Sequence, residues 1–436
     1  MKKVFLLILF VISFISLLKA GNNDDSIYND NIISPDIKTV LFSAAGVALS
    51  QPILSLNGGN QLQLSFDDLS GEERSYYYSI MQCNVNWTAS DLAPLDYMTG
   101  FNDNKITDFQ FSFNTFQKYT HYKLIFPNQD ISIIKSGNYI IKVFADDDPD
   151  KVVFMRRFMV VDQQINISGQ ITRPNDDDHI DTHQQVNFTV SYHNLPVTDP
   201  FTELVIVVQQ NNRFDNEIVG LNPQYVQNGQ LDYQYMPDLL FPGGKEFRYF
   251  DMQSLRFKGY HMVALDDTNN QYYVCLGTDE PRTYEKYLYM KDINGKYIIN
   301  TINSTQPNEE GDYAHVQFRL KMNNPLLGGK IYVVGALTNW QALPDYQMKY
   351  NFDTHFYTTD VYLKEGYYDY AYSYVEIGKK DLNLSEIEGD WFETENDYTI
   401  YVYYRPFGSR YDQLVDMTTL NSLLNNNMSN GSNNQH

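Results

Sequence analysis

The chain has 436 residues, too many for one hydrophobic core, which favours several domains. It carries 32 basic and 54 acidic side chains, a formal net charge of −22 that argues against a nucleic-acid backbone or an anionic membrane surface as its main partner. Hydrophobic residues make up 43% of the chain and include 36 Tyr and 26 Phe, a composition that excludes a disordered protein and favours β-strands.

Residues 1–20, MKKVFLLILFVISFISLLKA, have the layout of a secretory signal peptide. Two lysines precede an apolar stretch from Val4 to Leu18, and the small residue Ala20 stands where a signal peptidase would cut. The stretch is shorter than a membrane-spanning helix, so a signal peptide is favoured over a membrane anchor. No later segment is apolar enough to span a bilayer, which predicts an exported and soluble mature protein.

From Lys38 onward, short alternating or apolar runs are separated by Gly, Pro, Asn and Asp. This spacing is typical of all-β proteins and predicts tandem immunoglobulin-like (E-set) β-sandwiches. The acidic turn at 146–150 (DDDPD) joins two strands of a hairpin that closes the first of them. We expect a first sandwich over residues 21–162, a second over 163–306 and a third over 307–405.

Residues 406–436 are expected to form a C-terminal tail. The segment YDQLVDMTTLNSLL within it favours one or two amphipathic helical turns. The Asn- and Ser-rich stretch that follows Leu424 has the composition of a disordered end.

The two cysteines, Cys83 and Cys275, stand in separate apolar and aromatic runs. A disulfide is possible in an exported protein, but the two residues are predicted to lie in different sandwiches. Two buried thiols are therefore favoured over a disulfide, and the pairing stays open.

The sequence contains no G-x-S-x-G, HExxH or Lys-Ser/Thr phosphate-loop motif. The segment NDDDHIDTH brings His179 and His183 close to four aspartates, which are plausible metal ligands. It lacks the glycine and the final glutamate of a calcium loop, so a solvated acidic loop is favoured. We therefore predict no enzyme activity and no catalytic, cofactor-binding or metal-binding residues.

Residues 329–375 resemble the starch- and glycogen-binding sandwich modules of α-glucan enzymes, through Gly-x-x-x-Asn-Trp followed by Gly-Tyr-Tyr-x-Tyr. Under this reading Trp340 would stack on a sugar ring and Asn339 would bond its hydroxyls. The competing interpretation is that Trp340 fills the end of a sandwich. A secreted α-glucan-binding module protein is therefore the alternative function.

A longer resemblance covers nearly all of the mature chain. The segment from Leu64 to Asn128, which contains NVNWTASDLAPLDYMTGFND, resembles the N-terminal domain of the type IX secretion system plug protein family of Bacteroidetes. Later parts of that family resemble SGNYIIKVFADDDPDKVVFMRRFMVV, DTHQQVNFTVSY, FPGGKEFRYFDMQSLRF and GSRYDQLVDMTTLNSLL. The resemblance implies a non-catalytic periplasmic protein that binds the large outer-membrane β-barrel translocon and occludes its periplasmic opening when idle.

For such a protein the functional residues form an interface, and aromatic and long basic side chains are favoured interface anchors. Our candidates for contact with the translocon are Trp87, Phe101, Phe241, Lys245 and Arg248. Core packing is the competing interpretation for each of the aromatic candidates, and an internal salt bridge is the competing interpretation for Lys245 and Arg248.

Overall fold

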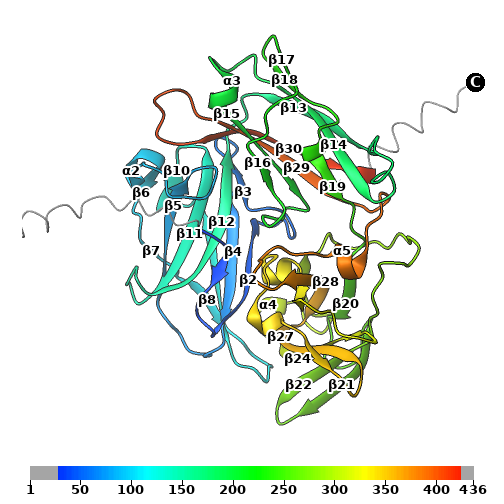
Figure 1. Ribbon diagram of the computed structural model, residues 1–436. Coiled ribbons are helices and arrows are strands. Elements are labelled where there is room, and N and C mark those ends of the chain that lie inside the picture. The colour runs from blue at the N-terminus through cyan, green and yellow to red at the C-terminus, as the bar shows by residue number, and fades with distance from the viewer. Residues whose placement is uncertain (1–27, 424–436) are drawn as a thin grey trace, which may run out of the picture.

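A computed structural model describes residues 28–423, shown in Figure 1. The expected signal peptide and the expected disordered end lie outside these residues. Strands predominate, as predicted, and the all-β fold class is confirmed. None of the helices in residues 28–423 has the length and hydropathy of a membrane span. The α-helices that lie wholly within residues 28–423 are single turns: α2 (Pro94–Tyr97), α3 (Pro200–Glu203), α4 (Pro307–Glu310) and α5 (Ser385–Glu388).

The first sandwich encloses a core of aromatic and branched side chains between two main sheets. One sheet has the order β1 (Asn31–Ile32), β12 (Val152–Val161), β11 (Gly137–Ala145), β5 (Tyr76–Cys83) and β7 (Asn104–Lys105), and β3 (Ile53–Ser55) joins β12. The facing sheet has the order β2 (Ile37–Ala44), β4 (Leu62–Asp68), β9 (Thr120–Phe126) and β8 (Asp108–Phe111). A small sheet pairs β6 (Met98–Gly100) with β10 (Ile131–Ile133).

The second sandwich is built from two distant parts of the chain around one core. One sheet has the order β13 (Asn166–Thr172), β14 (His183–Ser191), β18 (Gln230–Tyr233) and β17 (Tyr225–Gln227), and β19 (Leu240–Pro242) joins β14 after the 3-10 turn η1 (Pro237–Leu239). The facing sheet has the order β16 (Ile218–Val219), β15 (Leu204–Gln210), β29 (Asp397–Tyr404) and β30 (Gln413–Asn421).

The third sandwich lies between those two parts in the sequence and has its own core. One sheet has the order β20 (Arg248–Met252), β28 (Gly366–Glu376) and β23 (Tyr297–Ile299), and β25 (Gly329–Val334) joins β28. The facing sheet has the order β21 (Met262–Thr268), β22 (Gln271–Leu276), β24 (Tyr313–Lys321), β27 (Phe356–Lys364) and β26 (Lys349–Asn351). The 3-10 turns η2 (Ala336–Thr338) and η3 (Pro344–Tyr346) follow β25.

The sheets group the strands differently from the ranges expected for the second and third sandwiches, 163–306 and 307–405. Strands β20 to β22 belong to the third core, and β29 returns to pair with β15 along its whole length. The reason is that a strand's local pattern shows which face is buried but not which sheet will receive it.

The C-terminal segment after residue 405 also differs from the expected tail. Residues Gln413–Asn421 form β30, an edge strand antiparallel to β29, where helical turns had been predicted. The neighbouring Thr418 and Thr419 fit a strand better than a helix because β-branched side chains prefer the pleated conformation. The helical prediction for this segment is therefore wrong.

The two connections between the second and third sandwiches cross each other closely. Gly243 follows β19, and a Cβ atom at this position would lie 2.1 Å from the carbonyl oxygen of Trp391. Trp391 N in turn donates to the carbonyl oxygen of Gly244, at 2.9 Å. The glycine is required because any side chain would push the two connections apart.

Candidate functional site

The first and third sandwiches meet at a buried ion pair. Asp67 on β4 is fully buried, and it accepts from Lys364 Nζ on β27 at 2.7 Å and from Tyr313 OH at 2.7 Å. His121 Nδ1 lies 2.6 Å from its other oxygen. Burial opposes the charge, but Lys364 and His121 outweigh it and hold the pKa of Asp67 below its ordinary value. The boundary therefore contains a charged carboxylate whose partners come from both sandwiches.

A loop of the first sandwich adds further contacts to the same boundary. The carboxylate of Asp312 accepts from the backbone N of Phe116 and, at 3.1 Å, from that of Gln117. The ring of Phe116 stacks on that of Tyr272 with centroids 4.8 Å apart. Tyr119 OH donates to the carbonyl oxygen of Gly311 at 2.8 Å. These contacts fix the two sandwiches in one relative orientation.

The first and second sandwiches meet through a different set of contacts. Tyr403 OH on β29 donates to Asn138 Oδ1 on β11 at 2.7 Å, and both side chains are buried. Nearby, the Arg157 guanidinium lies 4.4 Å from the ring centroid of Trp87 and 4.5 Å from that of Phe214. The guanidinium donates to the carbonyl oxygen of Tyr28 at 2.7 Å. These contacts combine apolar burial with hydrogen bonds to neutral groups.

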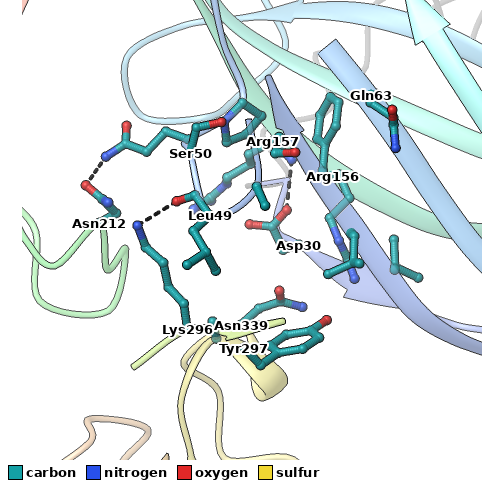
Figure 2. Close-up of a pocket in the computed structure, with 18 of the residues that line it drawn as sticks. Asp30, Leu49, Ser50, Gln63, Arg156, Arg157, Asn212, Lys296, Tyr297 and Asn339 are labelled. Carbon is teal, nitrogen blue, oxygen red and sulfur yellow. Dashed lines mark hydrogen bonds between the residues drawn. The ribbon is translucent and has the colours of Figure 1, made fainter. Parts of the chain in front are cut away.

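A cavity of about 500 Å³ lies where the three sandwiches meet. Figure 2 shows it between β12 of the first sandwich, the Asn212 loop of the second and residues 296–297 of the third. Its volume is in the range of small-molecule pockets. We refer to it as the junction cavity; its lining includes Arg156, Arg157, Asn212, Lys296, Asn339 and Trp340.

The charge in the junction cavity contrasts with that of the whole chain. Arg156, Arg157 and Lys296 line it together with one carboxylate, that of Asp30, although the chain carries 54 acidic side chains. Asp30 accepts from the backbone N of Arg157 at 2.8 Å. Burial lowers the pKa of both Arg156 and Lys296, and Asp30 and Asp397 respectively oppose that shift. The cavity is thus a locally cationic site in an acidic protein.

The sequence-predicted contact residues are mostly buried. The side chains of Trp87, Phe241, Lys245 and Arg248 are inside the molecule, whereas Phe101 is 79% exposed. The indole of Trp87 packs on Phe214 at the boundary between the first and second sandwiches. Phe241 belongs to the core of the second sandwich. In this conformation, of the five candidates, only Phe101 presents its side chain to a partner.

Lys245 and Arg248 form internal polar contacts near the start of the third sandwich. Arg248 pairs with Asp279 at 2.9 Å and with Glu388 at 3.1 Å. Lys245 Nζ donates to the carbonyl oxygen of Arg282 at 3.3 Å. The sequence could not distinguish this arrangement from a surface contact because the partners lie far along the chain.

The residues proposed for sugar stacking lie at the edge of the junction cavity. Trp340 is 7% exposed, and the Arg213 guanidinium lies 4.4 Å from its ring centroid. Phe247 contacts the same ring edge-to-face. Trp340 and Asn339 both adopt a left-handed backbone conformation. This packing supports the interpretation that Trp340 fills the end of the sandwich, because an open face for a sugar ring is lacking.

The two histidines that the sequence places among aspartates lie close together. His179 and His183 have ring centroids 4.5 Å apart, and His179 Nδ1 contacts Asp176. Within residues 28–423 no cluster has the geometry of a metal site.

Cys83 and Cys275 are both free, so the disulfide alternative is not observed. Cys83 is buried as predicted, whereas Cys275 is partly exposed, so its prediction as a buried thiol is wrong.

Exposed apolar residues occur on segments of the first and second sandwiches that contact each other. The loop between β29 and β30 reaches α2, where Arg410 pairs with Asp96 at 3.0 Å, and it meets α3, where Arg405 N donates to Glu203 O. Figure 1 shows this loop beside α2 and α3. The exposed apolar residues on these segments and directly after β6 and β10, which we call the apolar rim, are Leu95, Phe101, Ile134, Phe201 and Phe407.

Comparisons with known proteins give a family for the first sandwich and a similar solved structure for most of the chain. A family profile described as "Type 9 secretion system plug protein 1st domain" matches residues 37–162. A crystal structure of a hypothetical protein from Parabacteroides merdae ATCC 43184 is 38% identical, with a TM-score of 0.88, and the match covers 91% of this chain and 100% of that one. A marsupial T cell receptor is 9% identical over 79% of this chain and 98% of that one, with a TM-score of 0.16, too low to support an inference. No curated protein matches the chain.

The family profile and the structure address the same part of the molecule. The matched residues 37–162 contain the strands β2 to β12, which form the small β6–β10 sheet and, apart from the short strand β1, the two main sheets of the first sandwich. The relative from Parabacteroides merdae extends the similarity through the second and third sandwiches. The chain therefore belongs to the type 9 (type IX) secretion system plug protein family.

Proposed function

We propose that this protein is the periplasmic plug subunit of a type IX secretion system, which binds the outer-membrane β-barrel translocon and closes its periplasmic opening when no substrate passes. The observation that carries the proposal is the family match over the first sandwich. In this role the protein does no chemistry and acts by occupying space.

The joined architecture supports a steric role. A stopper has to resist deformation, and separate domains on flexible linkers move relative to each other. Here the Asp67–Lys364 pair joins the first sandwich to the third, and the Tyr403–Asn138 bond joins the first to the second. The three sandwiches therefore present one continuous body to a pore.

The apolar rim is our proposed contact with the translocon. Clustered exposed apolar side chains on a protein surface mark interaction sites, and aromatic residues are favoured anchors. The rim contains Phe101, the exposed residue among the sequence candidates, together with Phe201 and Phe407. It spans both the first and second sandwiches, so a partner bound there would contact both of them.

The test is copurification from the native host. The protein is tagged at its C-terminus, the outer membrane is solubilised in mild detergent, and the copurifying proteins are identified by mass spectrometry. We expect a barrel of translocon size in near-equal amount with the wild-type protein. We expect its loss with Phe101→Asp and Phe407→Asp, because a carboxylate cannot enter an apolar interface without a large desolvation cost.

A matched control separates the rim from general damage. Phe352 lies on a turn of the third sandwich and is 74% exposed, close to the exposure of Phe101. Phe352→Asp should leave copurification intact. Recovery of the wild-type protein without a barrel would refute the plug role, whereas equal loss with all three variants would refute the rim as the contact.

A further inference from the structure

The junction cavity contains a buried cation that no carboxylate contacts directly, although Asp30 acts on it at longer range. Arg156 on β12 is 5% exposed, and its Nη1 donates to the carbonyl oxygens of Met155, at 2.9 Å, and Asn31, at 3.5 Å. Among residues 28–423, no protein group accepts from its Nε or Nη2, and no carboxylate lies within salt-bridge distance of the guanidinium. A buried guanidinium in this state is costly unless something anionic accompanies it.

A second cation reaches the same cavity from another sandwich. Lys296 Nζ in the third sandwich donates to the carbonyl oxygen of Leu49 in the first, at 2.7 Å. An ammonium has three donors, and this is the one contact of Lys296 Nζ found among the described residues. Figure 2 shows the Lys296 and Arg156 side chains entering from opposite sides, with Asp30 between them.

The third cation has its own partners and forms part of the wall. The Arg157 guanidinium lies between the rings of Trp87 and Phe214 and donates to Tyr28 O and Asn29 Oδ1. It contributes positive potential to the cavity, while Arg156 keeps donors free.

The rest of the lining suits a small polar molecule. The amide side chains of Gln63, Asn212 and Asn339 can donate to or accept from a ligand. The rings of Phe42 and Phe214 give the cavity an apolar flank. A guanidinium with free donors on a planar fork matches the two oxygens of a carboxylate or a phosphate.

We propose that the junction cavity binds a small organic oxyanion, with Arg156 and Lys296 as its two cationic contacts. The ligand would lie between the first and third sandwiches and contact both. Because it binds the folded protein alone, it stabilises the joined arrangement.

The test is isothermal titration calorimetry on the purified mature protein at constant ionic strength, with succinate, citrate and inorganic phosphate as probes. Succinate and citrate represent organic carboxylates, and phosphate represents the phosphate class, so the series distinguishes the two sources of an oxyanion. We expect saturable binding of at least one probe with a stoichiometry near one. Maltotriose serves as a neutral probe and should not bind.

Two variants and one control assign the site. Arg156→Gln and Lys296→Gln should each weaken binding at least tenfold, and Lys296→Gln remains informative if the other variant does not fold. Arg256 is exposed on the third sandwich, so Arg256→Gln makes the same change of charge away from the cavity and should leave affinity unchanged. The proposal is overturned if no probe saturates, if Arg256→Gln weakens binding as much as Arg156→Gln, or if maltotriose binds equally well.

Discussion

Two places where sandwiches meet bury cations in different ways. At the first–third boundary, Lys364 is paired with the buried carboxylate of Asp67. In the junction cavity, Arg156 has carbonyl acceptors for one of its nitrogens and no ion pair among the described residues. Removing one partner of a buried ion pair destabilises the fold, because the other charge is left without a partner. A buried cation without an ion pair keeps hydrogen-bond donors that an anionic ligand can use. The two cations therefore differ in what they contact, although both lie between sandwiches.

The largest loss of stability is expected from breaking the buried Asp67–Lys364 ion pair. Lys364→Met leaves Asp67 buried without its cation and should lower the free energy of unfolding by about 3–5 kcal/mol, measured by urea denaturation. Lys379→Met is the control, because Lys379 forms an exposed pair with Glu376 that is worth about 0–1 kcal/mol. Equal effects of the two variants would show that the Asp67 pair contributes no more than a surface pair.

Removal of one hydrogen bond between neutral groups of the first and second sandwiches should lower the stability less. Tyr403→Phe leaves Asn138 Oδ1 buried without its donor, which should lower the free energy of unfolding by about 1–3 kcal/mol. The control is Tyr77→Phe, because the Tyr77 ring stacks on Phe144 and no hydrogen bond of its hydroxyl is found among the described residues. A loss as small as that of the control would contradict a role for this bond in joining the sandwiches.

A pH-dependent effect is expected near the cavity loop that carries Lys296. Asp369 is fully buried and accepts from Ile293 N, and burial together with Asp292 raises its pKa to about 8. Because this folded-state pKa lies above 3.8, the ordinary value of an aspartate, the stability that the carboxyl contributes is full at acidic pH. It is lost as the pH rises from there through about 8.

Asp369→Asn tests this pH dependence, because an amide stays neutral. The melting temperature of the variant relative to wild type should rise by a few degrees between about pH 5 and about pH 9. Asp353→Asn, at an exposed turn, should show no such trend. If the difference in melting temperature between Asp369→Asn and wild type stayed constant across this pH range, the raised pKa of Asp369 would be excluded.

The smallest change in stability is expected from replacing Arg156, the buried cation without an ion pair. Arg156→Met replaces the guanidinium by an apolar chain, and since no ion pair is broken, the free energy of unfolding should change by less than about 1 kcal/mol. Arg256→Met provides the surface comparison. A loss as large as that of Lys364→Met would show that Arg156 has a compensating partner in the protein and would remove the contrast between the two boundaries.

The fold class and the family could be predicted from the sequence because both are carried by local features. Alternating runs and turn residues show strands, and long runs such as NVNWTASDLAPLDYMTGFND are distinctive in themselves. The sheet that receives β29 and β30 could not be predicted, because pairing with β15 depends on a contact across almost the whole second half of the chain.

The candidate sites were harder to predict than the fold, because they are formed by residues that lie far apart in the sequence. Arg156 and Lys296 lie in different sandwiches, and nothing near either one in sequence indicates a shared cavity. Trp87 and Phe241 have the side-chain types of interface anchors, but core positions use the same types. Phe101, a sequence candidate for contact with the translocon, is exposed, whereas Phe407 was not among the candidates because its turn was assigned to a tail.

The return of β29 and β30 to the second sandwich has a consequence for the order of events during biogenesis. The sheet that contains β15 gains its central partner, β29, only when residues 397–404 are present. Because a chain is synthesised from its N-terminus, the first sandwich can be completed early, but the second has to wait until β29 and β30 have been made. Premature termination anywhere in the third sandwich would leave β15 with an open edge, which is a template for aggregation.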